Sequence, residues 1–106
     1  RMGDMTTHCG GVGTIISASK FPEARNQSYK LTIDFGRSGI LKSSAQITKL
    51  YIPQNLINKQ IIAVINLGSR KIANYESQCL ILGAVDKENV FLLKPKEKTL
   101  NGEIVF

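Results

Sequence analysis

A strict alternation of apolar and polar side chains over residues 29–35 constrains the fold more than any other feature of the chain. The apolar members are Tyr29, Leu31, Ile33 and Phe35, and the polar members are Lys30, Thr32 and Asp34. A period of two residues is typical of a β-strand with one buried face and one exposed face. After a tight turn over residues 36–39, a second strand is expected over 40–47. The polar face of that strand carries Lys42, Ser44 and Gln46. Because only a tight turn separates the two strands, they are expected to form a hairpin.

Short apolar runs separated by turn residues predict the remaining elements. We expect a first strand over 12–18, a loop over 19–28, a short helix over 53–58, a strand over 60–66, a basic loop over 67–78, strands over 79–85 and 90–93 joined by a turn at 86–89, and a polar C-terminal segment over 94–106. Three strands, a short helix and two or three further strands give the order of an all-β, five-stranded Greek-key OB-fold barrel with its helix between strands 3 and 4. An SH3-like barrel is the alternative, but it has no place for that helix.

The 106 residues are enough for one domain with a modest core. We expect an N-terminal tail over residues 1–11, derived in part from an expression vector because Arg1 precedes Met2, and an OB-fold domain over 12–106. The glycine-rich residues 10–13 are interpreted as an unstructured approach to the first strand. No apolar run approaches the roughly 18 residues of a membrane span, and no signal peptide precedes the domain, so we expect a cytoplasmic protein without membrane insertion.

Catalytic and metal-binding residue patterns are weak in this sequence. The only histidine, His8, lies in the expected tail, although a nucleophilic site needs a base held rigidly beside the nucleophile. His8 and Cys9 are adjacent, but they lack the second pair of ligands that a zinc site requires. Cys79 lies in an apolar run and is interpreted as a small buried hydrophobic residue. We therefore expect neither an enzyme nor a bound metal or cofactor.

A basic surface is the strongest functional prediction. The formal net charge is +6, which favours polyanionic partners. An OB-fold barrel binds ligands on the outer face of strands 2 and 3, between the loops that join strands 1 to 2 and 4 to 5. The residues expected there are Lys30, Thr32, Lys42, Ser44 and Gln46 on the strands, Lys20 and Arg25 in the first loop, and Asn66, Arg70, Lys71 and Ser77 around the second. No aromatic residue points outward from these two strands, so phosphate and ribose contacts with a folded RNA are expected rather than base stacking.

An exposed apolar groove that binds polypeptides is the second hypothesis. Its candidate residues all lie in loops, and they are Phe21, Leu67, Ile72 and Tyr75. A peptide bound through apolar contacts shows little dependence on salt, whereas RNA bound through phosphates shows a strong one.

Several runs along the chain closely resemble the CsaA family of small, free-standing tRNA-binding-domain proteins. The most specific are VGTII at 12–16, FPEAR at 21–25, YKLTIDFG at 29–36, SSAQIT at 43–48, LINKQ at 56–60 and RKIA at 70–73. The resemblance implies an OB fold, a homodimer and tRNA binding without base-specific contacts. It also implies a chaperone role in protein export, with unfolded or precursor polypeptides as partners. By position it assigns the RNA-facing surface to Lys42, Ser44, Gln46, Asn66, Arg70, Lys71 and Ser77.

Overall fold

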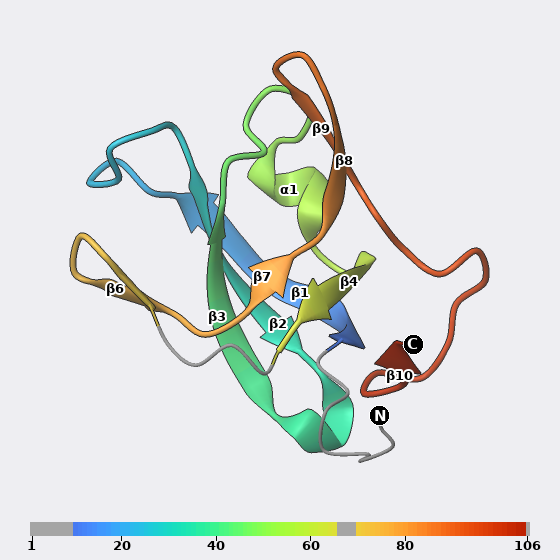
Figure 1. Cartoon of the computed structure of the whole chain (residues 1–106). Coiled ribbons are helices and arrows are strands. Elements are labelled where there is room, and N and C mark those ends of the chain that lie inside the picture. Colours follow the sequence, from blue (N-terminus) through green and yellow to red (C-terminus); the bar gives the residue numbers. More distant parts are fainter. Residues whose placement is uncertain (1–9, 66–69, 106) are drawn as a thin grey trace, which may run out of the picture.

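The computed structural model describes residues 10–65 and 70–105, which form a β-barrel with two projecting hairpins (Figure 1). The strands are β1 (Gly10–Lys20), β2 (Tyr29–Asp34), β3 (Ile40–Ala45), β4 (Gln60–Val64), β5 (Arg70–Ile72), β6 (Tyr75–Ser77), β7 (Leu80–Ile81), β8 (Gly83–Asp86), β9 (Asn89–Leu92) and β10 (Ile104–Val105). One α-helix, α1 (Pro53–Leu56), separates β3 from β4, and a 3-10 turn (Gly36–Ser38) joins β2 to β3. In this part of the chain, no helix is long and apolar enough to cross a membrane.

The main sheet has the order β3-β2-β1-β4-β7, with every neighbouring pair antiparallel. Contacts between β3 and the two residues before β7 nearly close it into a barrel. The amide of Gln78 donates to the carbonyl of Lys42 at 2.7 Å, and the Ser43 hydroxyl donates to the carbonyl of Cys79 at 2.9 Å. This order, with the helix between the third and fourth barrel strands, confirms the predicted five-stranded OB fold.

The core lies inside the barrel and follows the alternation in the sequence. Leu31, Ile33 and Phe35 are fully buried, whereas the polar residues between them keep part of their surface exposed. Leu56 of α1 is also buried and belongs to the same apolar cluster, so the helix contributes to the core. Complete burial of such a side chain stabilises the fold by about 1.5–3 kcal/mol. The apolar side of β2 is therefore held inside the barrel, and its polar side is the one left for a ligand.

Residues 10–13 are part of β1, so the prediction of an unstructured approach is wrong. Gly10 pairs with Val64 on one side of the strand and with Val105 on the other. At Gly13 a Cβ atom would lie 2.6 Å from Cγ2 of Ile33 and 2.7 Å from the ring of Phe35. The glycines are therefore needed for close contact between β1 and the core, rather than for chain flexibility.

The basic loop predicted over 67–78 contains a short hairpin, β5–β6. Arg70 pairs with Ser77 and Ile72 with Tyr75, and Ala73 takes a positive φ of 53° in the turn. Strands of three residues are too short to produce a recognisable period, so the sequence pattern could not predict them. Figure 1 shows this hairpin beside β3, on the side of the barrel opposite the C-terminal segment.

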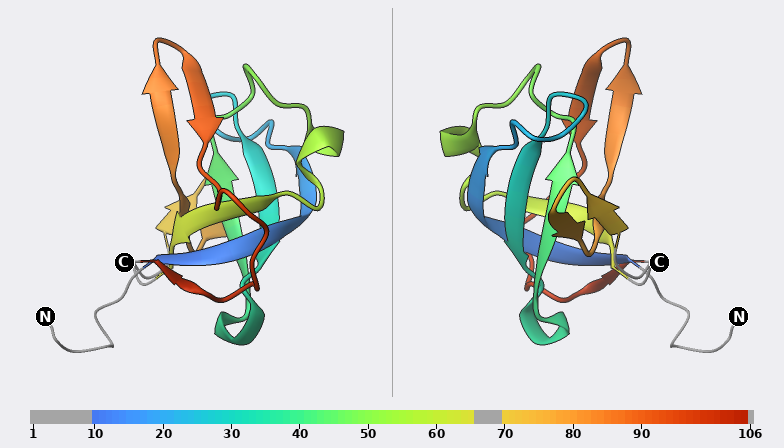
Figure 2. Two further views of the ribbon diagram at one scale, coloured as in Figure 1. Left: turned by 90° about the vertical axis from the view of Figure 1, so that its right-hand side faces the viewer. Right: turned by 90° about the vertical axis from the view of Figure 1, so that its left-hand side faces the viewer.

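The predicted hairpin near residues 79–93 is present, although its first strand is divided into β7 and β8. The turn between Asp86 and Asn89 is where the sequence placed it, and Lys87 has a positive φ of 59° there. Figure 2 shows the β8–β9 hairpin projecting from the barrel.

The C-terminal segment also departs from the prediction because β10 pairs with the start of β1. Next to β10, the amide of Gly102 donates to the carbonyl of Val12 at 2.8 Å. The hydroxyl of Thr14 donates to Oδ1 of Asn101 at 2.8 Å, which fixes the same segment to β1.

Candidate nucleic-acid interface

The outer face of β2 and β3 brings the predicted strand residues together. Lys30 lies opposite Ser44, and Thr32 lies opposite Lys42. Because directly opposite residues of an antiparallel pair project to the same side, and because the other side of β2 is the core, these four side chains face outward. Lys42 is exposed, and the other three are half-buried. Gln46, immediately after β3, is exposed as well.

Tyr75 of β6 supplies an aromatic ring beside this face. Nζ of Lys42 lies 5.4 Å from the centroid of that ring, and Nζ of Lys30 lies 5.5 Å from it. Phe21 packs against Tyr75 edge-on, with the ring centroids 5.4 Å apart, and Nζ of Lys30 is also 5.1 Å from the Phe21 centroid. The sequence correctly placed no aromatic residue on the outward side of β2 or β3. No local sequence pattern, however, predicted that the β5–β6 hairpin would place an aromatic ring beside Lys30 and Lys42.

The Tyr75 side chain fixes the β5–β6 hairpin to the barrel. Its hydroxyl donates to the carbonyl of Leu31 in β2 at 3.1 Å. Burial raises the pKa of Tyr75 above its ordinary value of 10.0, and the nearby Cys79 raises it further. The phenol therefore keeps its proton at neutral pH and remains a hydrogen-bond donor.

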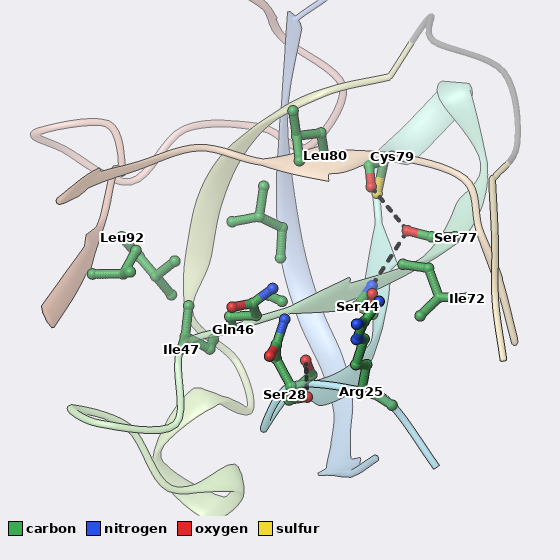
Figure 3. A pocket seen from close by; sticks show the side chains of 15 residues that line it. Arg25, Ser28, Ser44, Gln46, Ile47, Ile72, Ser77, Cys79, Leu80 and Leu92 are labelled. Atoms are coloured by element: carbon green, nitrogen blue, oxygen red, sulfur yellow. Dashed lines mark hydrogen bonds between the residues drawn. The ribbon is translucent and has the colours of Figure 1, made fainter. Parts of the chain in front are cut away.

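A cavity of about 440 Å³ opens beside the basic face, between the β1–β2 loop, the end of β3 and the strands β7 and β9 (Figure 3). Its polar lining comes from the first loop, from the end of β3 and the residue after it, and from β6, and it includes Arg25, Asn26, Ser28, Ser44, Gln46 and Ser77. Its apolar lining includes Ile47, Ile72, Leu80, Ile81, Val90 and Leu92. Because Ser44 lies both on the outer face and in this lining, the cavity is continuous with the basic face.

The predicted loop residues are placed in different ways. Arg25 is exposed at the cavity, and Lys71 is exposed on β5. Ser77 is only 9% exposed, and its hydroxyl accepts from the Ser44 amide and donates to the Cys79 carbonyl, each at 3.3 Å. Ser77 thus supports β3 and offers little surface to a ligand. Asn66 and the side chain of Arg70 lie outside the described residues, although the backbone of Arg70 belongs to β5.

Among the candidate residues of the polypeptide groove, Tyr75 contacts Phe21 and lies opposite Ile72 in the β5–β6 hairpin. Phe21 is 4% exposed and lies against Tyr75, whereas Ile72 lines the cavity. Leu67 lies outside the described residues. The cavity wall is a further apolar surface, and it includes Leu80 and Leu92.

Reactive groups are scarce in the described part of the chain. Within residues 10–65 and 70–105, no three His, Cys, Asp or Glu residues lie close enough to hold a metal ion. Burial raises the pKa of Cys79 to about 11, with a hydrogen bond from Ser43 acting in the opposite direction. Its thiol is therefore protonated at neutral pH, and a protonated thiol is a poor nucleophile.

Comparison with known proteins agrees with a binding surface. The family model described as "Putative tRNA binding domain" matches residues 11–104. A methionine–tRNA ligase of Pyrococcus horikoshii is 38% identical over 94 residues, which is 88% of this chain and 13% of the ligase. A second, from Methanococcoides burtonii, is 30% identical over 95 residues. The chain thus spans only 13% and 14% of the lengths of these relatives.

Two solved structures match over nearly the whole chain. The chaperone CsaA of Bacillus anthracis strain Ames is 41% identical, with a TM-score of 0.89, and the match covers 97% of this chain and 94% of that one. The CsaA chaperone protein of Picrophilus torridus is 42% identical, with a TM-score of 0.88 and coverage of 97% and 95%. These matches confirm the resemblance to CsaA that the sequence predicted. On the family model and these structures together, the chain belongs to the tRNA-binding domain family.

Proposed function

We propose that this protein is a non-catalytic module that binds folded tRNA with the outer face of β2 and β3. The observation that carries the proposal is the clustering of Lys30 and Lys42 with the hydroxyls of Thr32 and Ser44 on one face of the barrel. The wider binding set keeps the other residues predicted from sequence, which are Arg25, Gln46, Asn66, Arg70 and Lys71, whereas Ser77 supports β3 through its hydrogen bond with the Ser44 amide.

The recognition mode follows from the chemistry of this face. Ammonium groups and hydroxyls bind phosphate and ribose oxygens, which carry no base sequence. The ring of Tyr75 is engaged with the two lysines and with Phe21, so it is not free to stack on a splayed base. Reading of shape and backbone, common to all tRNAs, is the mode that these groups support.

We further propose that the protein is a homodimer and acts in the cytoplasm. The similarity to CsaA proteins motivates it, and a symmetric pair of basic faces would contact a longer stretch of RNA than one small domain can. Light scattering coupled to size exclusion should give twice the mass of one chain, and the mass of a single chain would contradict the dimer.

The test of RNA binding is a titration of labelled total tRNA at several salt concentrations, with duplex DNA of equal length as competitor. If one face neutralises about four to six phosphates, log K falls by about 3 to 5 for each tenfold rise in salt. We expect this steep slope and poor competition by DNA. Equal competition by DNA, or no binding, would mean that the basic face is only a solvated surface.

A second function, binding of unfolded or precursor polypeptides in protein export, is supported by the apolar cavity wall. Leu80 is 46% exposed and lines the cavity, so it offers contact to an apolar side chain. Leu80→Ser, which removes the apolar side chain without adding charge to the neighbouring basic face, should abolish suppression of aggregation of an unfolded test protein and leave tRNA affinity unchanged. Suppression that is unaffected by this change would argue against the cavity as the polypeptide site.

A further inference from the structure

Lys30 and Lys42 are placed where two like charges repel. They are diagonal neighbours on one face of the β2–β3 pair, because Lys30 lies opposite Ser44 and Lys42 lies opposite Thr32. Their proximity therefore needs another source of stabilisation.

The ring of Tyr75 supplies that stabilisation. Both ammonium groups lie within 5.5 Å of its centroid, and the negative face of an aromatic ring attracts a cation. The ring is itself held in place by the hydrogen bond to Leu31 and by the edge contact with the buried ring of Phe21. Two flexible lysines are thus restrained by a rigid aromatic pair.

We propose that Lys30 and Lys42, held by Tyr75, form a two-cation site for a phosphate group of the RNA backbone, with Tyr75 as the positioning residue. The proposal rests on the function proposed above and deepens it. Each ammonium group has three N–H donors, and one turned toward the ring leaves others for phosphate oxygens. Lysines that are restrained before binding lose less side-chain entropy when the phosphate arrives.

The site also depends on the β5–β6 hairpin. Tyr75 belongs to β6, whereas the lysines belong to β2 and β3, so the two-cation site exists only when the hairpin is docked on the barrel. Lys71 of β5 belongs to the same hairpin as the positioning ring. A loss of the ring should therefore weaken RNA binding although no charge is removed.

The first test is a double-mutant cycle on tRNA affinity. Tyr75→Leu should raise Kd about three- to tenfold in the otherwise unchanged protein, because two lysines lose their restraint. Tyr75→Phe, which keeps the ring, should recover most of this loss. Phe91→Leu, which removes an exposed ring on β9, is the matched control and should leave Kd unchanged.

The cycle is completed in the Lys30→Ala/Lys42→Ala background. There Tyr75→Leu should have no further effect, because the ring acts through the lysines that are already absent. The same three- to tenfold loss in both backgrounds would show that Tyr75 only stabilises the fold, and it would overturn the proposal.

A second test does not depend on tRNA. Inorganic pyrophosphate is titrated into the protein while the side-chain NMR signals of Lys30, Lys42 and Lys96 are followed. The first two should shift at lower concentration than Lys96, an exposed lysine of the C-terminal segment, and this preference should disappear in Tyr75→Leu. Equal shifts of all three overturn the two-cation site. A selective shift in a protein that binds no tRNA would retain the site and refute the proposed function instead.

Discussion

Removing the two lysines of the outer face should change the salt dependence of tRNA binding by a calculable amount. The double variant Lys30→Ala/Lys42→Ala lowers the formal net charge of +6 by two. Each phosphate contact contributes about 0.7 to 0.9 to the slope of log K against log salt. If both lysines contact phosphates, the slope should become shallower by about 1.4 to 1.8.

The assay is fluorescence anisotropy of labelled tRNA from about 50 to 200 mM salt, the range in which phosphate contacts produce large changes in affinity. The matched control is Lys96→Ala/Lys98→Ala, which removes the same charge from exposed residues of the C-terminal segment. The control should alter the slope much less, because long-range attraction is screened over roughly 10 Å at these salt concentrations. An equal change of slope in both double variants would refute a localised phosphate site, since net charge alone would then explain binding.

Three further outcomes follow from the structure. Lys42→Ala should weaken binding to individual tRNA isoacceptors by the same factor, as measured by filter binding, and a loss confined to one isoacceptor would contradict shape-based recognition. Gly13→Ala should lower the free energy of unfolding, measured in urea, by about 1–3 kcal/mol, because the added Cβ would lie 2.6 Å from Ile33 and 2.7 Å from the ring of Phe35. An unchanged midpoint of urea unfolding would contradict that packing. Burial raises the pKa of Cys79 from 9.0 to about 11, so the unfolded thiol ionises first as the pH rises. The stabilisation that comes from keeping the buried Cys79 thiol protonated is complete below about pH 9 and is lost between about pH 9 and pH 11. The alkaline decline in thermal stability should therefore be smaller in Cys79→Ala than in the unchanged protein. Identical pH profiles of the two proteins would rule out Cys79 as the cause of the decline.

The barrel strands could be predicted where the sequence repeats long enough to show a period. The alternation over β2 fixed which side of that strand is buried, and therefore placed Lys30 and Thr32 on the outer face. The turn after β8 was also predictable, because polar turn residues separate two apolar runs there. The short strands β5, β6 and β10 were missed because two or three residues carry no period, and their pairing depends on distant partners.

The loop part of the site was less predictable for the same reason. Phe21 and Tyr75 were both placed in loops, and nothing in the local sequence indicates that their rings meet. Ser77 is likewise buried where its hydroxyl accepts a hydrogen bond from the amide of Ser44, a residue of a distant strand. Local patterns therefore predicted the residues on regular strands, whereas residues on loops depended on tertiary contacts.

Binding of tRNA by the outer face of β2 and β3 is tested most directly by mapping the tRNA site on the protein by NMR. Backbone amide signals of the isotope-labelled protein are followed as unlabelled tRNA is added. We expect the largest changes at Lys30, Thr32, Lys42 and Ser44 and along the β5–β6 hairpin. Changes concentrated on the β8–β9 hairpin or the C-terminal segment, with β2 and β3 unaffected, would contradict that expectation.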